Sequence, residues 1–211
     1  MQVYINFGGL PSWLAIAPLK RIIAETGVAI DWQPMLGNLG NVASANVKAG
    51  EEDPLADYKA RRAAARSRAK ARELERMCET LELSPQLGSR KIDPLFLALG
   101  LLWAREKTDG AGQMTFVETA FTQTYRTSAE PSAESVAGVT EVLKLAGVDA
   151  DGFAAFCEAE RESLKASRET TLQKSVLNAP AFILEEEVFN GREHLPLIEW
   201  ILKGRTGTPP V

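Results

Sequence analysis

The chain is short of the side chains that carry redox and metal chemistry, because its 211 residues include only two cysteines and one histidine. Cys78 and Cys157 are far apart and lie in helical patterns, so we expect two buried thiols rather than a disulfide. No Cys-x-x-Cys is present, which argues against dithiol exchange because a hydroxyl group cannot form a disulfide. His194 has neither a second metal ligand nor a serine near it in the sequence, so we expect a helix-surface residue and no metal site.

Long apolar runs and an excess of positive charge are also lacking. No stretch of eighteen apolar residues exists, so no membrane span is expected. The N-terminus enters a strand without the basic and apolar regions of a signal peptide, so we expect a cytoplasmic protein. A net charge of −4 and a pI of about 5.3 argue against a general nucleic-acid or anionic-membrane binder. With 45% apolar and 25% charged residues, the chain is typical of a globular protein with one good core.

The first segment that indicates a site is a strand that runs into a helix through two glycines. Apolar residues alternate over residues 3–7, as in a half-buried strand, and Gly8 and Gly9 break the alternation. Pro11 follows where the first turn of a helix tolerates proline, and the helical pattern ends at Gly27. Such a junction directs free backbone N–H groups at one point, which attracts anions through hydrogen bonds and the helix dipole. We therefore expect an active-site corner here.

Further strands are predicted after this helix and near the C-terminus. Residues 28–35 predict a strand parallel to the first, since a helix connects the two. Residues 181–184 and 188–189 predict a hairpin with a tight turn at Glu186-Glu187, and residues 193–202 predict a closing helix.

The middle of the chain is predicted to be helical. The expected helices cover about residues 54–83, 93–103, 114–126, 131–147 and 149–174, after a loop over residues 36–50 that is rich in Gly, Asn and Ser. The first of these helices carries many lysines and arginines. No aromatic residue interleaves with them after Tyr58, and glutamates follow, so we interpret a solvated face rather than a nucleic-acid site.

The run from Tyr4 to Ala15 resembles the start of DsbA-like thioredoxin-fold proteins, especially 2-hydroxychromene-2-carboxylate isomerases and kappa-class glutathione transferases. Their pattern is aromatic-x-Asp-x-x-Ser-Pro-aromatic-Ser-aromatic-Leu-Ala, and it is matched without gaps at Tyr4, Phe7, Ser12, Trp13, Leu14 and Ala15. The family's catalytic serine, which is the first cysteine of the redox branch, falls on Gly9. Its proline falls on Leu10, and the second cysteine falls on Ser12. The resemblance therefore implies a site without a thiol at either redox position.

A second segment with the same resemblance covers residues 176–182, which are similar to the family's Val-Phe-Gly-Val-Pro-Thr-Phe. The proline of that segment is cis in the family, which implies a cis bond between Ala179 and Pro180, opposite Gly9. A cis proline exposes backbone groups of the preceding residue to an extended peptide such as glutathione. The resemblance thus adds Ala179, Pro180 and Leu10 to the expected glutathione contacts. A proline that only starts an edge strand is the alternative.

Four further glutathione contacts are implied by the resemblance. Residues 189–195 are similar to Phe-Gly-Ser/Asn-Asp-Arg-Leu, in which the acidic residue binds the γ-glutamyl amine; Glu193 matches it, and Arg192 precedes it. A carboxylate here also stabilises a helix start for structural reasons alone. Asn46 matches the asparagine of a Gly-Asn loop, although ordinary turn residues look alike. Arg66 is the nearest match to the basic residue that holds the glycine carboxylate.

The resemblance implies a thioredoxin-like α/β fold with an inserted all-helical domain. Residues 1–50 and 175–211 would form the thioredoxin-like domain, and residues 51–174 the helical insertion. The related families form dimers, so a homodimer is expected.

Three functions remain open from the sequence. The first is a glutathione-dependent isomerase or transferase that acts on a small molecule, with the thiolate at the start of the first helix and Ser12 as a candidate catalytic hydroxyl in place of the one absent at Gly9. Losing one such donor costs roughly 10²–10³ in rate at a comparable site. The second is a DsbA-type oxidoreductase homologue without Cys-x-x-Cys. The third is a non-catalytic binding protein with the same fold, because fold alone does not decide function.

Overall fold

The computed structural model describes residues 1–37, 55–80, 83, 92–126 and 133–210. Its contacts divide the chain into two compact units, Met1–Leu39 with Ile92–Val211 and Gly40–Lys91. The second unit contains α2 (Ala56–Thr80), a helix of 25 residues that confirms the helix predicted there. The first unit contains the sheet and the other described helices. The domain boundaries predicted near residues 50 and 175 stay a prediction.

The sheet of the first unit has four strands in the order β2-β1-β3-β4. The strands are β1 (Gln2–Ile5), β2 (Asp31–Pro34), β3 (Ala181–Leu184) and β4 (Glu187–Asn190). β1 is parallel to β2 and antiparallel to β3, and β3 and β4 form a hairpin. The predicted parallel pair and hairpin are thus confirmed.

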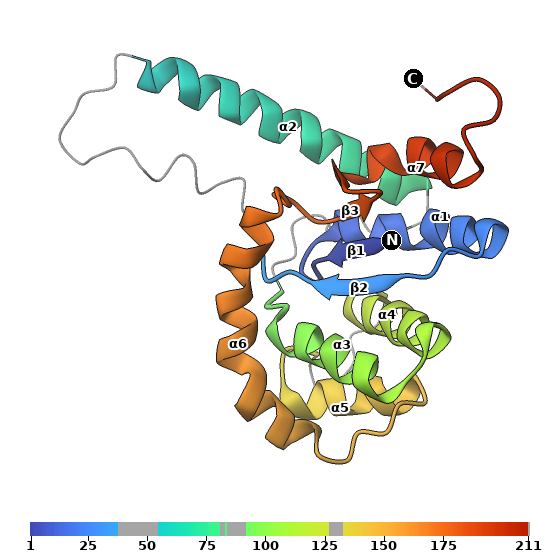
Figure 1. Ribbon diagram of the computed structural model, residues 1–211. Helices are drawn as coiled ribbons and strands as arrows, with labels where there is room; N and C mark the ends of the chain where they lie inside the picture. The colour runs from blue at the N-terminus through green and yellow to red at the C-terminus, as the bar shows by residue number, and fades with distance from the viewer. Residues whose placement is uncertain (38–54, 81–82, 84–91, 127–132, 211) are drawn as a thin grey trace. The chain divides into compact units, whose positions relative to one another are not determined.

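The helices of the first unit lie on both sides of this sheet. They are α1 (Leu10–Thr26), α3 (Leu95–Lys107), α4 (Gly110–Tyr125), α5 (Val136–Leu145), α6 (Phe153–Gln173), the 3₁₀ helix η3 (Arg192–His194) and α7 (Leu195–Leu202). Figure 1 shows α1 and α7 on one side of the sheet and α3 and α4 on the other. α1 ends where predicted, at Gly27, whose φ of 68° suits glycine.

The two faces of the sheet differ in character. Val3, Trp32 and Phe182 lie side by side in the register and are fully buried on one face, while Tyr4 and Ala181 are buried on the other. On the opposite face, Asp31 accepts a hydrogen bond of 2.7 Å from Arg105 of α3. This contact attaches the helical segment to β2.

Several element boundaries differ from their predictions; α5, for example, begins at Val136, after Ser135 as its cap, rather than at residue 131. The hairpin turn is at Glu185 and Glu186, one residue earlier than expected. Both residues adopt positive φ (50° and 71°), as the two central residues of a type I′ turn do. Glutamate gives no sequence signal for positive φ. α4 begins at Gly110 rather than near residue 114, because the Asp109 carboxylate caps it by accepting from the Gly112 N–H.

Candidate functional site

The predicted corner between β1 and α1 is organised by Asn6. Its carbonyl accepts a hydrogen bond from the Gly9 N–H (3.0 Å), and its Oδ1 accepts one from the Gly8 N–H (2.9 Å). A Cβ atom on Gly8 would lie 2.6 Å from the Ile92 carbonyl oxygen, so the loop requires glycine there. These bonds turn the chain tightly from the strand into the helix.

Gly9, the position of the family's catalytic side chain, has room for one. Its φ of −118° and ψ of 110° are ordinary extended angles, which any residue adopts. The nearest atoms to a Cβ atom here would belong to Asn6, at 3.4 Å for its carbonyl oxygen and 3.7 Å for its Nδ2, which are ordinary contact distances. The corner therefore contains a space next to residue 9 that accepts a Cβ atom without overlap among the described residues.

The first turn of α1 offers fewer backbone donors than the sequence predicted. The N–H groups of Gly8 and Gly9 bind Asn6, and Pro11 has none. Among the described residues, no hydrogen-bond partner is found for the Leu10 N–H. The positive end of the helix dipole lies at the same place. Gly9, as the N-cap residue, has no side chain that could bind these N–H groups. The corner can thus bind one anionic atom, while the buried side chain of Leu10 faces the core.

Ser12 is fully buried, and its Oγ accepts a hydrogen bond of 3.1 Å from the Asn6 N–H. Its hydroxyl therefore fastens the loop to the helix from the inner side. This placement favours a structural role, and the catalytic role of Ser12 stays a prediction.

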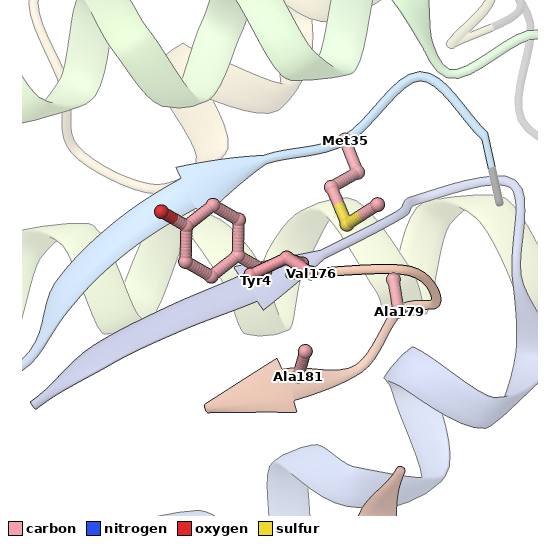
Figure 2. Packing of buried hydrophobic residues seen from close by; sticks show 5 residues of the cluster. All are labelled: Tyr4, Met35, Val176, Ala179 and Ala181. Atoms are coloured by element: carbon pink, nitrogen blue, oxygen red, sulfur yellow. The ribbon is translucent and has the colours of Figure 1, made fainter. Parts of the chain in front are cut away.

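The Ala179–Pro180 bond is cis, as the resemblance implied. Tyr4 pairs with Ala181, so Pro180 enters β3 beside the end of β1 that leads to the corner. Figure 2 shows the loop turning from Val176 past Ala179 into β3. Tyr4, Met35, Val176, Ala179 and Ala181 form one buried cluster beneath this loop. The sheet register thus brings the two halves of the predicted site to one end of the sheet.

The predicted residues Arg192 and Glu193 are also at this end. The Gly191 N–H donates to the Pro180 carbonyl (2.9 Å), which ties the start of η3 to the cis proline. Glu193 is exposed and folds its carboxylate over Gly191, where any Cβ atom would overlap it. Arg192 is half-buried.

Two predicted residues are not placed at this site. Asn46 lies outside the described residues. Arg66 belongs to α2, in the other compact unit, and its side chain is exposed. Their glutathione contacts stay predictions.

Sequence reasoning missed the residue that holds the proline loop. The Asn190 Oδ1 accepts from the Leu177 N–H (2.8 Å) and the Asn178 N–H (3.4 Å), and its Nδ2 donates to the Ser175 carbonyl (3.1 Å). Its position at the end of β4, 12 to 15 residues from these partners, leaves no local signal for this role.

Tyr125 was also missed, because its spacing fits a core position of α4. Its hydroxyl donates to the Phe7 carbonyl (3.2 Å), and its ring stacks on Trp13 with centroids 5.0 Å apart. The Phe7 ring packs on Phe116 and Phe121 of the same helix. The helical segment therefore holds the corner from the side.

A pocket of about 360 Å³ opens beside the corner. The Met35 N–H donates to the Ile5 carbonyl, so residues 35–37 leave the sheet at the same end as the corner. Met35, Leu36 and Leu164 line the pocket together with Lys165 and Arg168 of α6. Its size suits a small organic molecule.

Redox and metal chemistry find no support in the described residues. Cys78 and Cys157 are buried free thiols, as predicted, and burial raises both pKa values, that of Cys157 to about 11. Neither is a reactive thiolate at neutral pH. No cluster of three His, Cys, Asp or Glu side chains within the described ranges is suited to a metal ion. None of the described helices meets the length and hydropathy needed to span a membrane.

The comparisons with known proteins give structural matches only. No family model and no curated protein matches the sequence. Among solved structures, a 2-hydroxychromene-2-carboxylate isomerase matches with a TM-score of 0.63 and 18% identity, over 97% of this chain and 94% of the other. A probable DsbA oxidoreductase from Streptomyces coelicolor matches with 0.63 and 13%, over 100% and 92%.

A third match is the cytosolic disulfide reductase DsbM from Pseudomonas aeruginosa, crystallised with GSH. Its TM-score is 0.53 and its identity 16%, over 97% of this chain and 98% of the other. Identities this low establish the fold and not the activity. The β1–α1–β2 unit, the hairpin after a cis proline and these matches together show that the chain has the DsbA-like thioredoxin fold with a helical insertion.

Proposed function

We propose that the chain is a glutathione-dependent isomerase or transferase that holds the thiol of glutathione beside Gly9. The observation that carries the proposal is the space next to Gly9 at the open start of α1. A sulfur atom in this space lies at the positive end of the helix dipole and near the Leu10 N–H. Both favour the thiolate over the thiol, which is the form that attacks or adds to an electrophile.

The remaining glutathione contacts would come from the second half of the site. The peptide would extend along Ala179 and Pro180, with Glu193 at the γ-glutamyl amine and Arg192 next to it. The bond between Gly191 and Pro180 supports this arrangement, because it holds the carboxylate and the proline loop together. The pocket at Met35 would receive the small-molecule substrate, whose apolar part fits Leu36 and Leu164. The homodimer stays an expectation from the resemblance.

A thiolate delivered by glutathione accounts better for this site than dithiol exchange does. The sequence has no cysteine at residue 9 or 12, and its two thiols are buried elsewhere. Glutathione would supply the nucleophile that the chain lacks. A non-catalytic binding protein would share the site but would leave the bound thiol protonated.

The test is calorimetric titration with glutathione, which we expect to give saturable binding at millimolar concentration or better. Gly9→Leu should weaken binding about tenfold or more, equivalent to about 1.4 kcal/mol, because its side chain fills the space. Gly110→Leu is the control, since Gly110 also lies at the start of a helix, α4, and a Cβ atom there meets nothing within 4 Å. Ultraviolet thiolate absorbance of bound glutathione at neutral pH supports the enzyme, and its absence supports the binding protein. A titration in which glutathione gives no binding heat would refute the proposed function.

A further inference from the structure

Asn6 carries a side-chain donor that faces the position of the missing catalytic side chain. Its Oδ1 accepts from the Gly8 N–H at 2.9 Å, and this bond fixes which end of the amide is the oxygen. The Nδ2 group therefore lies on the other side, 3.7 Å from where a Cβ atom on residue 9 would be.

The amide nitrogen is not used by the fold. Within the described part of the chain, Asn6 binds its neighbours through its carbonyl, its N–H and its Oδ1, and its Nδ2 has no hydrogen-bond partner. Two unused N–H donors on a half-buried amide lower the stability of the fold unless water or a ligand accepts hydrogen bonds from them. A ligand sulfur atom bonded to a carbon at the Cβ position of residue 9 would lie within hydrogen-bond distance of these donors.

We propose that Asn6 is a catalytic residue whose Nδ2 donates a hydrogen bond to the thiolate sulfur bound beside Gly9. It thereby supplies the donor that Gly9, without a hydroxyl, does not. This inference rests on the proposed function only in that the sulfur belongs to glutathione. A donor aimed at a developing or resident anion stabilises it most when the protein has already fixed its direction, as the Gly8 bond does here.

Other charges near the corner also act on such a sulfur. The dipole of α1 favours the anion, and η3, which packs against α1, contributes Arg192, Glu193 and His194. Arg126 of the α4 terminus lies over the Trp13 ring at 5.7 Å. An experiment must therefore separate a hydrogen bond from Asn6 from a general change in charge.

The test uses Gly9→Cys as a reporter, because a side chain fits at residue 9 without strain. The pKa of the new thiol is measured from the pH dependence of alkylation by iodoacetamide, followed by mass spectrometry of the peptide that contains residue 9. Adding Asn6→Asp keeps an acceptor for the Gly8 N–H but removes the donor. We expect the thiol pKa to rise by about one unit or more.

The matched control is Asn178→Asp in the same Gly9→Cys background. It introduces an equal charge at the same end of the sheet, on the loop before Pro180, at an exposed side chain that forms no hydrogen bond with the described residues. Repeating the measurements in high salt screens the charge effect but not a direct hydrogen bond. A rise of the thiol pKa for Asn6→Asp that persists in salt and exceeds that of Asn178→Asp supports the proposal.

Equal shifts for the two aspartate variants, or no shift for Asn6→Asp, would overturn the role of Asn6. This outcome is independent of glutathione binding, since the reporter thiol belongs to the protein. If the thiol pKa responds as expected but calorimetry detects no glutathione, Asn6 remains a thiolate donor and only the proposed ligand is wrong.

Discussion

At the scale of single residues, two adjacent glycines have opposite requirements. Gly8 is confined by the Ile92 carbonyl oxygen, whereas Gly9 has ordinary backbone angles and space beside it. The first glycine is therefore needed to build the corner. The second leaves space for a Cβ atom beside residue 9.

Alanine at each position tests this difference. Gly8→Ala should lower the free energy of unfolding by about 1–3 kcal/mol, because the Cβ atom displaces backbone. Gly9→Ala should change the free energy of unfolding by less than about 1 kcal/mol, because the restriction of the unfolded chain offsets the poorer N-cap preference of alanine. Urea unfolding of both variants measures the difference. Equal destabilisation would contradict the described loop geometry.

Residue roles at the corner were predictable only in part. The resemblance around Gly9, Pro180 and Glu193 named segments that the fold brings to one end of the sheet, and the cis bond was confirmed. The burial of Ser12 and the direction of the Asn6 amide were not foreseen, because they depend on hydrogen bonds that only the folded loop creates. A residue type and its spacing do not specify which way a side chain points.

At the scale of elements, the loop before Pro180 depends on β4. One side chain, Asn190, satisfies three backbone groups of residues 175–178, and Ser175 among them has a positive φ of 60°. The sequence predicted the hairpin and the proline but not this link between them. Long-range side-chain to backbone bonds have no local pattern.

Replacing Asn190 should loosen this loop. Asn190→Ala removes all three bonds and should lower the free energy of unfolding by about 1–2 kcal/mol. Asn190→Asp retains the acceptor and should lose less. Hydrogen exchange at the Leu177 and Asn178 amides, together with urea unfolding, measures both effects. Unchanged exchange in Asn190→Ala would show that other contacts hold the loop.

At the scale of the whole molecule, a cluster of charged side chains joins α1 and α7, the first and last helices of the first unit. Glu199 of α7 accepts from Arg21 of α1 and from Lys203, and Lys203 also contacts Glu25. The hydrogen bond from Arg21, followed by that from Lys203, lowers the pKa of Glu199 from 4.5 to about 2. This cluster joins α1 to the C-terminal end of α7.

The shift predicts how stability depends on pH. Because the folded pKa lies below the ordinary value, the contribution of Glu199 is present above about pH 4.5 and is lost as the pH falls toward 2. The difference in thermal midpoint between wild type and Glu199→Gln should therefore be largest near neutral pH and should shrink on acidification. Glu141→Gln, which breaks a pair within α5, is the control. A difference that is constant from pH 7 to pH 3 would exclude this origin.

The unobstructed position of residue 9 has an evolutionary consequence. Glycine codons that end in a pyrimidine are one base away from serine and from cysteine codons, and nothing in the surrounding loop must change to accept either side chain. Where Gly9 is encoded by such a codon, a hydroxyl or a thiol at the head of the first helix is one base change away. Under the proposed function, such a change would replace the nucleophile supplied by glutathione with one that belongs to the protein, without a change of fold.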